Sequence, residues 1–455
     1  VLAEKNGVYT ISNIHENQNV TVQGVARDNT APTVTIHLEE NKWSAFPSSH
    51  AFSLFFKNAQ TVEITATDDA GSGVAGTEYF VSDVSYASPE ALEAAAKKQW
   101  KTYSNSFTIA PNSKNVIYAK ATDKMGNVGY ASSNGIVLYT DAALSTPSIS
   151  FTKTGTDDVT ADVTLNGNTV DEIYCGSDML TAGTDYTVSG GTINFYASWL
   201  NTLSAGDHTL MVHYNPLGVL YVDDAGDDTP GTTSIALSVS KATGSVTITN
   251  GISKVYDGEP VVDVEYDHNS TGIAKVEYKA QAAEDSAYTA NTPSAVGDYT
   301  VRVTVAADDN YTEASATKDF TIRYLEAPEN PYTLSGKNGD NGWYTSDVTI
   351  TPPEGYTVSS TLAGEYAGSL TISESPTGNV TIYLKNQQGQ MTDAITVSEK
   401  INIDKDDPTI TATGDTANYL QSDTVTISAS DGTSGVAKVE VRKDSGEAVD
   451  ITDSY

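Results

Sequence analysis

The sequence predicts an all-β protein, a string of antiparallel β-sandwiches with one helical insertion near residues 88–100. Apolar and polar residues alternate through most of the chain, as in Thr61–Thr67 and Tyr299–Val305. This period is typical of strands with one buried and one wetted face. Turn-forming pairs such as Asn166-Gly167 and Asp257-Gly258 separate the runs. At 455 residues the chain is too long for one core, so we expect several sandwiches in series.

Five joints rich in acidic or turn-forming residues interrupt the strand pattern, and each contains proline, which favours extended connections. They are 28–33, 140–148, 222–234, 324–333 and 404–409. The predicted modules are 1–30 (closing strands of a truncated module), 31–141 (with the helical insertion), 143–222, 235–324, 326–403 and 407–455 (the start of a truncated module).

One unit occurs twice. Residues 61–80 read TVEITATDDAGSGVAGTEYF and residues 424–443 read TVTISASDGTSGVAKVEVRK. The joints DNTAPT and DKDDPT precede the two copies at matching positions. We interpret the unit as one strand pair of a recurring module.

The helical insertion begins at Ser88, which can cap a helix, and Pro89 suits the first helical position. Leu92, Ala95, Ala96 and Trp100 fall on one stripe, which predicts that the helix covers a sandwich. Residues 196–206 predict one or two further helical turns.

The segments GDYT (297–300) and GDHT (206–209) each place a tight turn before a buried strand. We expect the hydroxyl of Tyr299 to bond back to the turn backbone, as in a tyrosine corner.

Charge and cysteine content exclude several classes of protein. Lys and Arg number 25 against 59 Asp and Glu, a net charge of −34, so the chain would repel nucleic acid. No apolar run approaches the roughly 18 residues that span a bilayer, so we expect no membrane insertion. Cys175 is the only cysteine, which excludes internal disulfides and multi-thiolate metal sites. We expect a monomer.

Signatures of catalysis are absent from the sequence, including the G-x-S-x-G and H-E-x-x-H patterns and the P-loop. The six histidines are scattered, and alternation places His208 and His213 on opposite faces of one strand. We therefore predict no catalytic residues.

Acidic turns are the candidate metal sites, because Ca²⁺ takes six to eight oxygen ligands from carboxylates and loop carbonyls. We expect no cofactor other than Ca²⁺. The candidate residues for it are Asp68 and Asp69 with Ser72, then Asp404, Asp406 and Asp407, and a third group of Asp223, Asp224, Asp227 and Asp228. The alternative is that these carboxylates are merely solvated turn residues.

Aromatic side chains are the candidate glycan-binding groups, since sugar C–H faces pack on exposed rings. Trp343 and Tyr344 follow a glycine-rich turn, and Trp43 is a further candidate, whereas Trp100 and Trp199 lie on predicted apolar stripes. The alternative for each is packing in a core.

Several regions of the chain resemble three bacterial module families. APTVTIHLEENKW, ATDDAGSGV and VIYAKATDKMGNVGY, within 31–141, resemble immunoglobulin-like repeats of large bacterial surface proteins. The resemblance also covers half of a module at 407–455 and, more weakly, 326–403. Residues 163–214, with LNG, GTDYTVSGGTI and LSAGDHTL, resemble an immunoglobulin-like module called carbohydrate-binding and found beside catalytic domains in secreted bacterial glycosidases. KVYDGEPV and AVGDYTVRVT resemble a Tyr-Asp-Gly type adhesin module. The resemblances imply immunoglobulin-like folds and an extracellular or wall-attached setting in a Gram-positive bacterium.

The expected function is a non-catalytic stalk or adhesin segment that spaces and displays binding modules and contacts glycans, cell wall or a surface protein weakly. Host or plant glycans are the expected partners. The alternatives are the accessory modules of a secreted polysaccharide-degrading enzyme and a cytosolic repeat scaffold. Whether Lys–Asn isopeptide bonds cross-link the sandwiches depends on contacts between side chains, which the sequence does not give.

Overall fold

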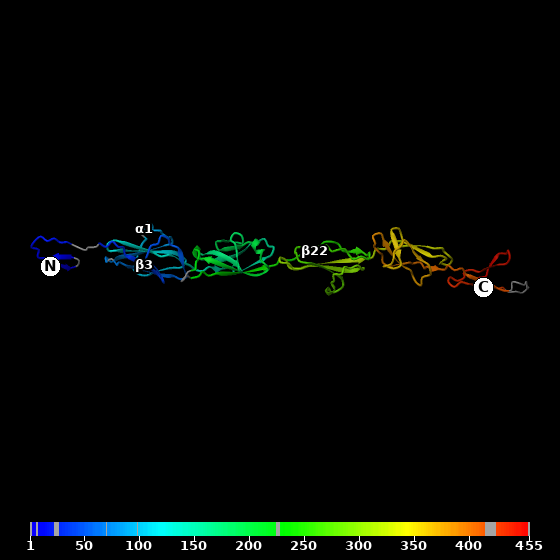
Figure 1. Ribbon diagram of the computed structural model, residues 1–455. Coiled ribbons are helices and arrows are strands. Elements are labelled where there is room, and N and C mark those ends of the chain that lie inside the picture. The colour runs from blue at the N-terminus through cyan, green and yellow to red at the C-terminus, as the bar shows by residue number, and fades with distance from the viewer. Residues whose placement is uncertain are drawn as a thin grey trace. The chain divides into compact units, whose positions relative to one another are not determined.

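The computed structural model describes residues 2–5, 8–21, 27–69, 71–97, 99–223, 228–414 and 425–453. Strands form most of their regular structure, so the predicted all-β class is confirmed. The chain divides into two compact units, Val1–Ala242 and Thr243–Tyr455, each built from paired sheets (Figure 1). Among the helices that the structure describes, none has the length and apolarity needed to cross a membrane.

The first sandwich of unit 1 packs a four-stranded sheet, β4-β3-β6-β9, on a sheet of order β5-β12-β10-β7-β8, with β11 beside β10. Its strands are β3 (Thr33–Leu38), β4 (Asn41–Trp43), β5 (Phe52–Phe56), β6 (Gln60–Thr67), β7 (Val74–Ser82), β8 (Lys101–Thr102), β9 (Phe107–Ile109), β10 (Ser113–Asp123), β11 (Val128–Ser132) and β12 (Gly135–Leu138). In β6, Val62 and Ile64 are buried while Thr61 and Glu63 are exposed, as the alternation predicts.

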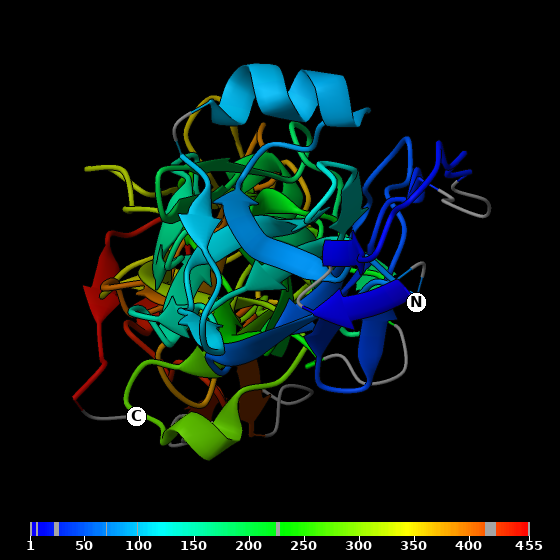
Figure 2. The same ribbon diagram turned by 90° about the vertical axis from the view of Figure 1, so that its left-hand side faces the viewer.

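The predicted helix is present as α1 (Pro89–Ala96), shorter than 88–100 because Lys97 leaves helical geometry at φ 27°. Ser88 caps it, its hydroxyl oxygen accepting a hydrogen bond from the Ala91 N–H at 3.3 Å. Leu92 and Ala96 are buried with Tyr118, so the helix covers the larger sheet from outside (Figure 2).

The second sandwich of unit 1 has sheet orders β13-β15-β19-β18 and β14-β21-β20-β16-β17. Its elements are β13 (Ala143–Leu144), β14 (Ser148–Thr152), β15 (Val159–Thr164), β16 (Thr169–Cys175), β17 (Asp178–Met179), β18 (Tyr186–Ser189), β19 (Thr192–Phe195), α2 (Ala197–Leu200), β20 (Gly206–Asn215), the 3₁₀ turn η1 (Pro216–Gly218) and β21 (Thr233–Ser240). The single helical turn α2 lies within residues 196–206, where one or two helical turns were predicted.

This sandwich corrects one predicted boundary. We expected 143–222 and 235–324 to be separate modules, but β21 pairs with β14 and β20 and so belongs to the earlier one. Ile235, Leu237 and Val239 of β21 are buried in its core. The alternation of residues 233–240 identifies a strand but not the sheet that it joins.

The two sandwiches of unit 1 share a small apolar cluster at their joint. Phe55, Val137 and Tyr139 are buried there against Leu217, Val219 and Tyr221. The rings of Phe55 and Tyr221 lie 5.0 Å apart, edge to face. Polar bonds flank the cluster, with Lys57 Nζ 2.7 Å from an Asp141 carboxylate oxygen and the Lys57 N–H donating to Asp228 at 2.6 Å. These contacts stabilise a defined arrangement at this joint.

The first sandwich of unit 2 has sheets β22-β24 and β23-β27-β26-β25. Its elements are β22 (Val246–Ile248), β23 (Lys254–Val255), β24 (Tyr266–His268), β25 (Ala274–Ala280), the 3₁₀ turn η2 (Asp285–Ala287), β26 (Gly297–Val305) and β27 (Ala314–Arg323). The predicted tyrosine corner is confirmed, since the Tyr299 hydroxyl donates to the Ala295 carbonyl at 3.0 Å. In the related GDHT segment, His208 Nε2 lies 2.9 Å from the Ser204 carbonyl oxygen.

The second sandwich of unit 2 has sheets β28-β30-β32, β29-β35 and β31-β33-β34. Its strands are β28 (Thr333–Ser335), β29 (Trp343–Tyr344), β30 (Val348–Thr351), β31 (Tyr356–Ser359), β32 (Leu370–Ile372), β33 (Thr381–Asn386), β34 (Ile395–Thr396) and β35 (Asn402–Ile403).

Three strand pairs, one near the start of the chain and two near its end, complete the described elements. They are β1 (Leu2–Lys5) with β2 (Val8–Ile11), β36 (Thr409–Thr413) with β37 (Thr426–Ser430), and β38 (Glu440–Arg442) with β39 (Ala448–Asp450).

Each of the four sandwiches also contains one parallel strand pair in otherwise antiparallel sheets. The pairs are β5–β12, β14–β21, β23–β27 and β29–β35. In each case an early strand lies beside the last strand of its sandwich, a long-range pairing that alternation alone does not reveal.

Candidate functional site

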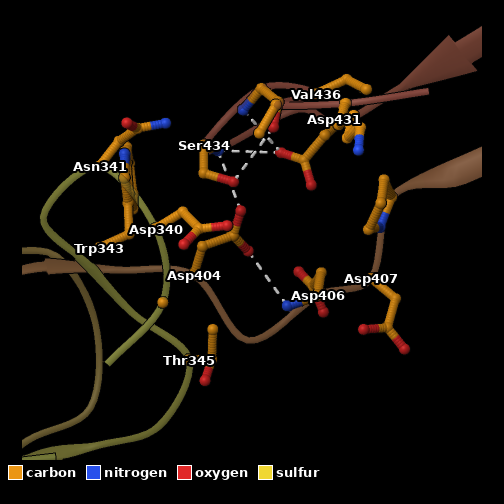
Figure 3. Close-up of a pocket in the computed structure, with 15 residues that line it drawn as sticks. Asp340, Asn341, Trp343, Thr345, Asp404, Asp406, Asp407, Asp431, Ser434 and Val436 are labelled. Atoms are coloured by element: carbon orange, nitrogen blue, oxygen red, sulfur yellow. Dashed lines mark hydrogen bonds between the residues drawn. The ribbon is translucent and has the colours of Figure 1, made fainter. Parts of the chain in front are cut away.

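A pocket of about 470 Å³ in unit 2 brings together residues from two of the predicted sites (Figure 3). Trp343 of β29 lines it, as do Asp404, Asp406 and Asp407 of the joint that leads into β36. The turn between β37 and β38 closes it with Asp431 and Ser434. The sequence placed the tryptophan and the three carboxylates in different sites, and the tertiary structure places them around one pocket.

The joint carboxylates differ in their surroundings. Asp404 is buried, and its two oxygens accept hydrogen bonds from the backbone N–H groups of Asp406 (3.0 Å) and Ser434 (2.9 Å). A hydrogen bond from the Ser434 side chain, together with these N–H groups, lowers the pKa of Asp404. Asp406 and Asp407 are exposed. Asp404 therefore fastens the joint to the 431–435 turn, and the other two carboxylates face solvent.

Of the three predicted glycan-binding aromatics, Trp343 lines this pocket, and Tyr344 packs against the core of the second sandwich of unit 2. Trp43 packs against the core of the first sandwich of unit 1. Trp343 is half-buried and follows a turn in which Asn341 and Gly342 take φ of 56° and 79°. Of these three rings, Trp343 has the geometry to meet a ligand in the pocket.

In unit 1 the structure gathers carboxylates differently from the prediction. Asp68 lies with Asp28 and Asp123, and one oxygen from each lies within 4.8 Å of the others. Asp69, the predicted companion of Asp68, is exposed and outside this group. Ser72, the third member predicted, donates to Asp68 at 2.9 Å. The sequence analysis did not predict Asp28 or Asp123 as members of this site. They lie in the DNTAPT joint and the ATDKMGN turn, and only the folded structure brings them next to Asp68.

The third predicted acidic group has no common site in the described residues. Asp224 and Asp227 lie outside them. The hydroxyl of Tyr221 donates to Asp223 at 2.9 Å, and Asp228 accepts from the Lys57 N–H at the joint of unit 1.

The outer face of the sheet β17-β16-β20 carries a row of side chains outside all the predicted sites. Tyr174 pairs in register with Met179 on one side and with Met211 on the other. The two methionines are 58% and 42% exposed, so they and Tyr174 form an apolar row on the surface of the sheet. The ring of His213 lies 5.4 Å from that of Tyr174, and the Tyr174 hydroxyl donates to Glu172 at 2.6 Å. That hydrogen bond raises the pKa of Tyr174.

This row presents apolar, polarisable side chains with the polar groups of Glu172 and His213 beside them. Strand spacing makes three strands roughly 10 Å across. The sequence alternation indicates that Met211 and His213 face outward, because they alternate with the buried Leu210 and Val212. The contribution of β16 and β17 depends on strand pairing.

Residues 144–218, which include this row, match the family model of Carbohydrate binding domain X2. A 58-residue stretch is 43% identical to Cellulose-binding protein A of Clostridium cellulovorans. The stretch is 13% of this chain and 3% of that protein's length. The chain thus contains a segment similar to carbohydrate-binding domains, which confirms the resemblance predicted for residues 163–214 of the module 143–222. The Tyr-Asp-Gly resemblance and the Gram-positive setting stay predictions.

Solved structures of multi-module proteins align with parts of the chain. A tri-modular endo-beta-1,4-glucanase from Bacillus licheniformis is 15% identical, over 40% of this chain and 39% of that one, with a TM-score of 0.18. An I-band fragment from titin is 12% identical, over 64% of this chain and 99% of that one, with a TM-score of 0.29.

Proposed function

We propose that this chain is a non-catalytic, extracellular, glycan-binding segment that serves a polysaccharide-degrading protein as accessory modules. The observation that carries the proposal is the match of residues 144–218 to a carbohydrate-binding domain. The identity to Cellulose-binding protein A points to a β-glucan such as cellulose as the ligand class. This favours the accessory-module alternative over the stalk or adhesin expected first.

The binding face in this proposal is the row Met179–Tyr174–Met211. The ring of Tyr174 offers a flat apolar surface to sugar C–H groups, and the methionine side chains extend that surface on both sides. Glu172 and His213 supply polar atoms for sugar hydroxyls. A net charge of −34 is compatible with a neutral glucan and opposes binding of polyanions.

Spacing is the second part of the proposal. The apolar cluster at the joint of unit 1 buries Phe55 and Tyr139 against residues of the next sandwich. A joint that is packed in this way presents the binding face in a defined orientation to its neighbour. This feature also suits the stalk function, in which modules hold a binding face away from a cell wall.

The test is retention of the full chain on insoluble cellulose and in gels containing soluble β-glucans. We expect wild-type protein to be retained and Tyr174→Ala to bind about tenfold more weakly, about 1.4 kcal/mol. The side chain lies on the wetted face, so the substitution leaves the fold intact. Tyr9→Ala, which removes a 66% exposed ring outside the matched segment, is the control and should bind normally.

Two outcomes would contradict the proposal. In one, no β-glucan retains the wild-type chain. In the other, Tyr174→Ala and Tyr9→Ala bind equally well, which would remove the row from the binding face.

A further inference from the structure

Three segments of the first sandwich converge at one end of it. Asp28 lies in the joint before β3, Asp68 in the turn between β6 and β7, and Asp123 at the end of β10. The joint lies directly on β11, because a Cβ atom added to Gly129 would come within 1.8 Å of the Pro32 carbonyl oxygen. Only glycine permits this approach. The convergence is therefore built into the backbone of the module.

Asp28 and Asp123 have few positively charged neighbours among the described residues. Asp123 is 2% exposed, and neither Asp28 nor Asp123 forms an ion pair with a Lys or Arg in the part of the chain that the structure describes. Asp28 uses one carboxylate oxygen to accept from the Thr30 N–H at 3.0 Å. Its other oxygen, Oδ2, is buried and has no hydrogen-bond partner among the described residues.

An unpartnered buried carboxylate oxygen beside two further carboxylates is unfavourable without a cation. Burial penalises the charged form, and like charges at this separation repel. Backbone N–H groups and Asn127 already bind Asp123, whose Oδ1 accepts from the Met125 and Asn127 N–H groups at 2.8 Å. Within the described ranges, no such donor reaches Asp28 Oδ2. The buried oxygen thus independently indicates a missing positive ligand.

We propose that Asp28, Asp68 and Asp123 bind a Ca²⁺ ion. Two oxygens held at about 2.4 Å from one Ca²⁺ lie at most about 4.8 Å apart, and the three carboxylate oxygens meet that limit. Water and neighbouring carbonyl oxygens complete a shell of six to eight. The ion fastens the entering joint to the two turns at the end of the sandwich.

The second copy of the duplicated unit repeats two of the three positions. Asp404 corresponds to Asp28 in the joint, and Asp431 corresponds to Asp68 in the turn. Asp404 again reaches the turn, where it accepts from the Ser434 N–H at 2.9 Å. Contact between joint and turn through an aspartate is therefore a property of the unit.

The experiment is hydrogen exchange by mass spectrometry on the full chain, in EDTA and in 5 mM CaCl₂ at matched ionic strength. We expect Ca²⁺ to slow exchange at least tenfold in peptides covering 27–33 and 121–129. Extracellular modules bind Ca²⁺ with a Kd of about 10⁻⁴ to 10⁻³ M, so titration by calorimetry should show binding in that range. Equal protection by 5 mM MgCl₂ would overturn the proposal, because it would indicate screening of charge instead of a Ca²⁺ site.

Two variants and a matched control locate the ion. Asp28→Asn keeps the oxygen that accepts from Thr30 and offers N–H groups to the remaining carboxylates. It should fold, bind one Ca²⁺ fewer, and exchange slowly at 27–33 even in EDTA. Asp123→Asn should also bind one ion fewer.

Asp69→Asn makes the same change in charge at an exposed neighbour and should behave as wild type. No protection by Ca²⁺ in the wild type, undiminished stoichiometry in Asp28→Asn, or loss of the ion in Asp69→Asn would each refute the site.

Discussion

The tyrosine corner of unit 2 provides a sharp test of the link between sequence and packing. Tyr299→Phe removes one hydroxyl and leaves the ring, which stacks on Phe320 at 5.5 Å between centroids. The lost interaction is the 3.0 Å hydrogen bond to the Ala295 carbonyl. Ala295 is exposed, so water can bind the freed carbonyl and the loss stays near the ordinary value for one bond.

We expect this loss to lower the free energy of opening of β26 by about 1 kcal/mol, which is roughly a fivefold faster exchange of its protected amides. Native-state hydrogen exchange on the full chain measures this locally, which is preferable to a melting curve because several sandwiches unfold in one molecule.

Tyr266→Phe is the matched control for this measurement. Tyr266 packs against the same core, and its hydroxyl forms no hydrogen bond among the described residues. The control should leave the exchange of β26 unchanged. Equal effects of the two variants would refute the corner as a stabilising device.

Two further predictions concern pH and the Trp343 pocket. Backbone N–H groups, first that of Thr271, bind Asp308 and lower its pKa. A lowered folded-state pKa means that its stabilisation is present above pH 3.8 and is lost as pH falls further, so exchange in peptides covering 269–273 should accelerate at pH 3, after correction for intrinsic rates. Asp308→Asn should remove that pH dependence, and an unchanged dependence would contradict this role. Trp343→Ala should leave the retention on cellulose that depends on Tyr174 unchanged. It should weaken any glycan binding in the pocket of unit 2, which is measured by titrating the variant with soluble oligosaccharides. Unaltered affinity would exclude Trp343 as a ligand contact.

Local signals predicted much of the fold. The period of two identified strands such as β6, because each strand of a sandwich must bury one face regardless of its partners. The cap at Ser88 and the corner at Tyr299 were also predictable, because their partners lie three and four residues away. The resemblance of 143–222 to carbohydrate-binding modules also rested on local segments of sequence.

Pairing over long distances decided the rest. The alternating run 233–240 could complete either neighbouring sandwich, and only its pairing with β14 and β20 assigned it to the earlier one. The row through Tyr174 likewise depends on the register of three strands. The sequence also placed Asp68 with Asp69, although adjacent residues on a chain need not converge. Asp28 and Asp123 reach Asp68 from 40 and 55 residues away only when the joint packs on Gly129.

By itself, then, the sequence determined the strands, their buried faces and the helix α1, since these depend on neighbours within a few residues. The tertiary structure alone decided which sheet each strand joins and which carboxylates and rings share a site. Such groupings depend on contacts between segments tens of residues apart, and a periodic pattern carries no information about them.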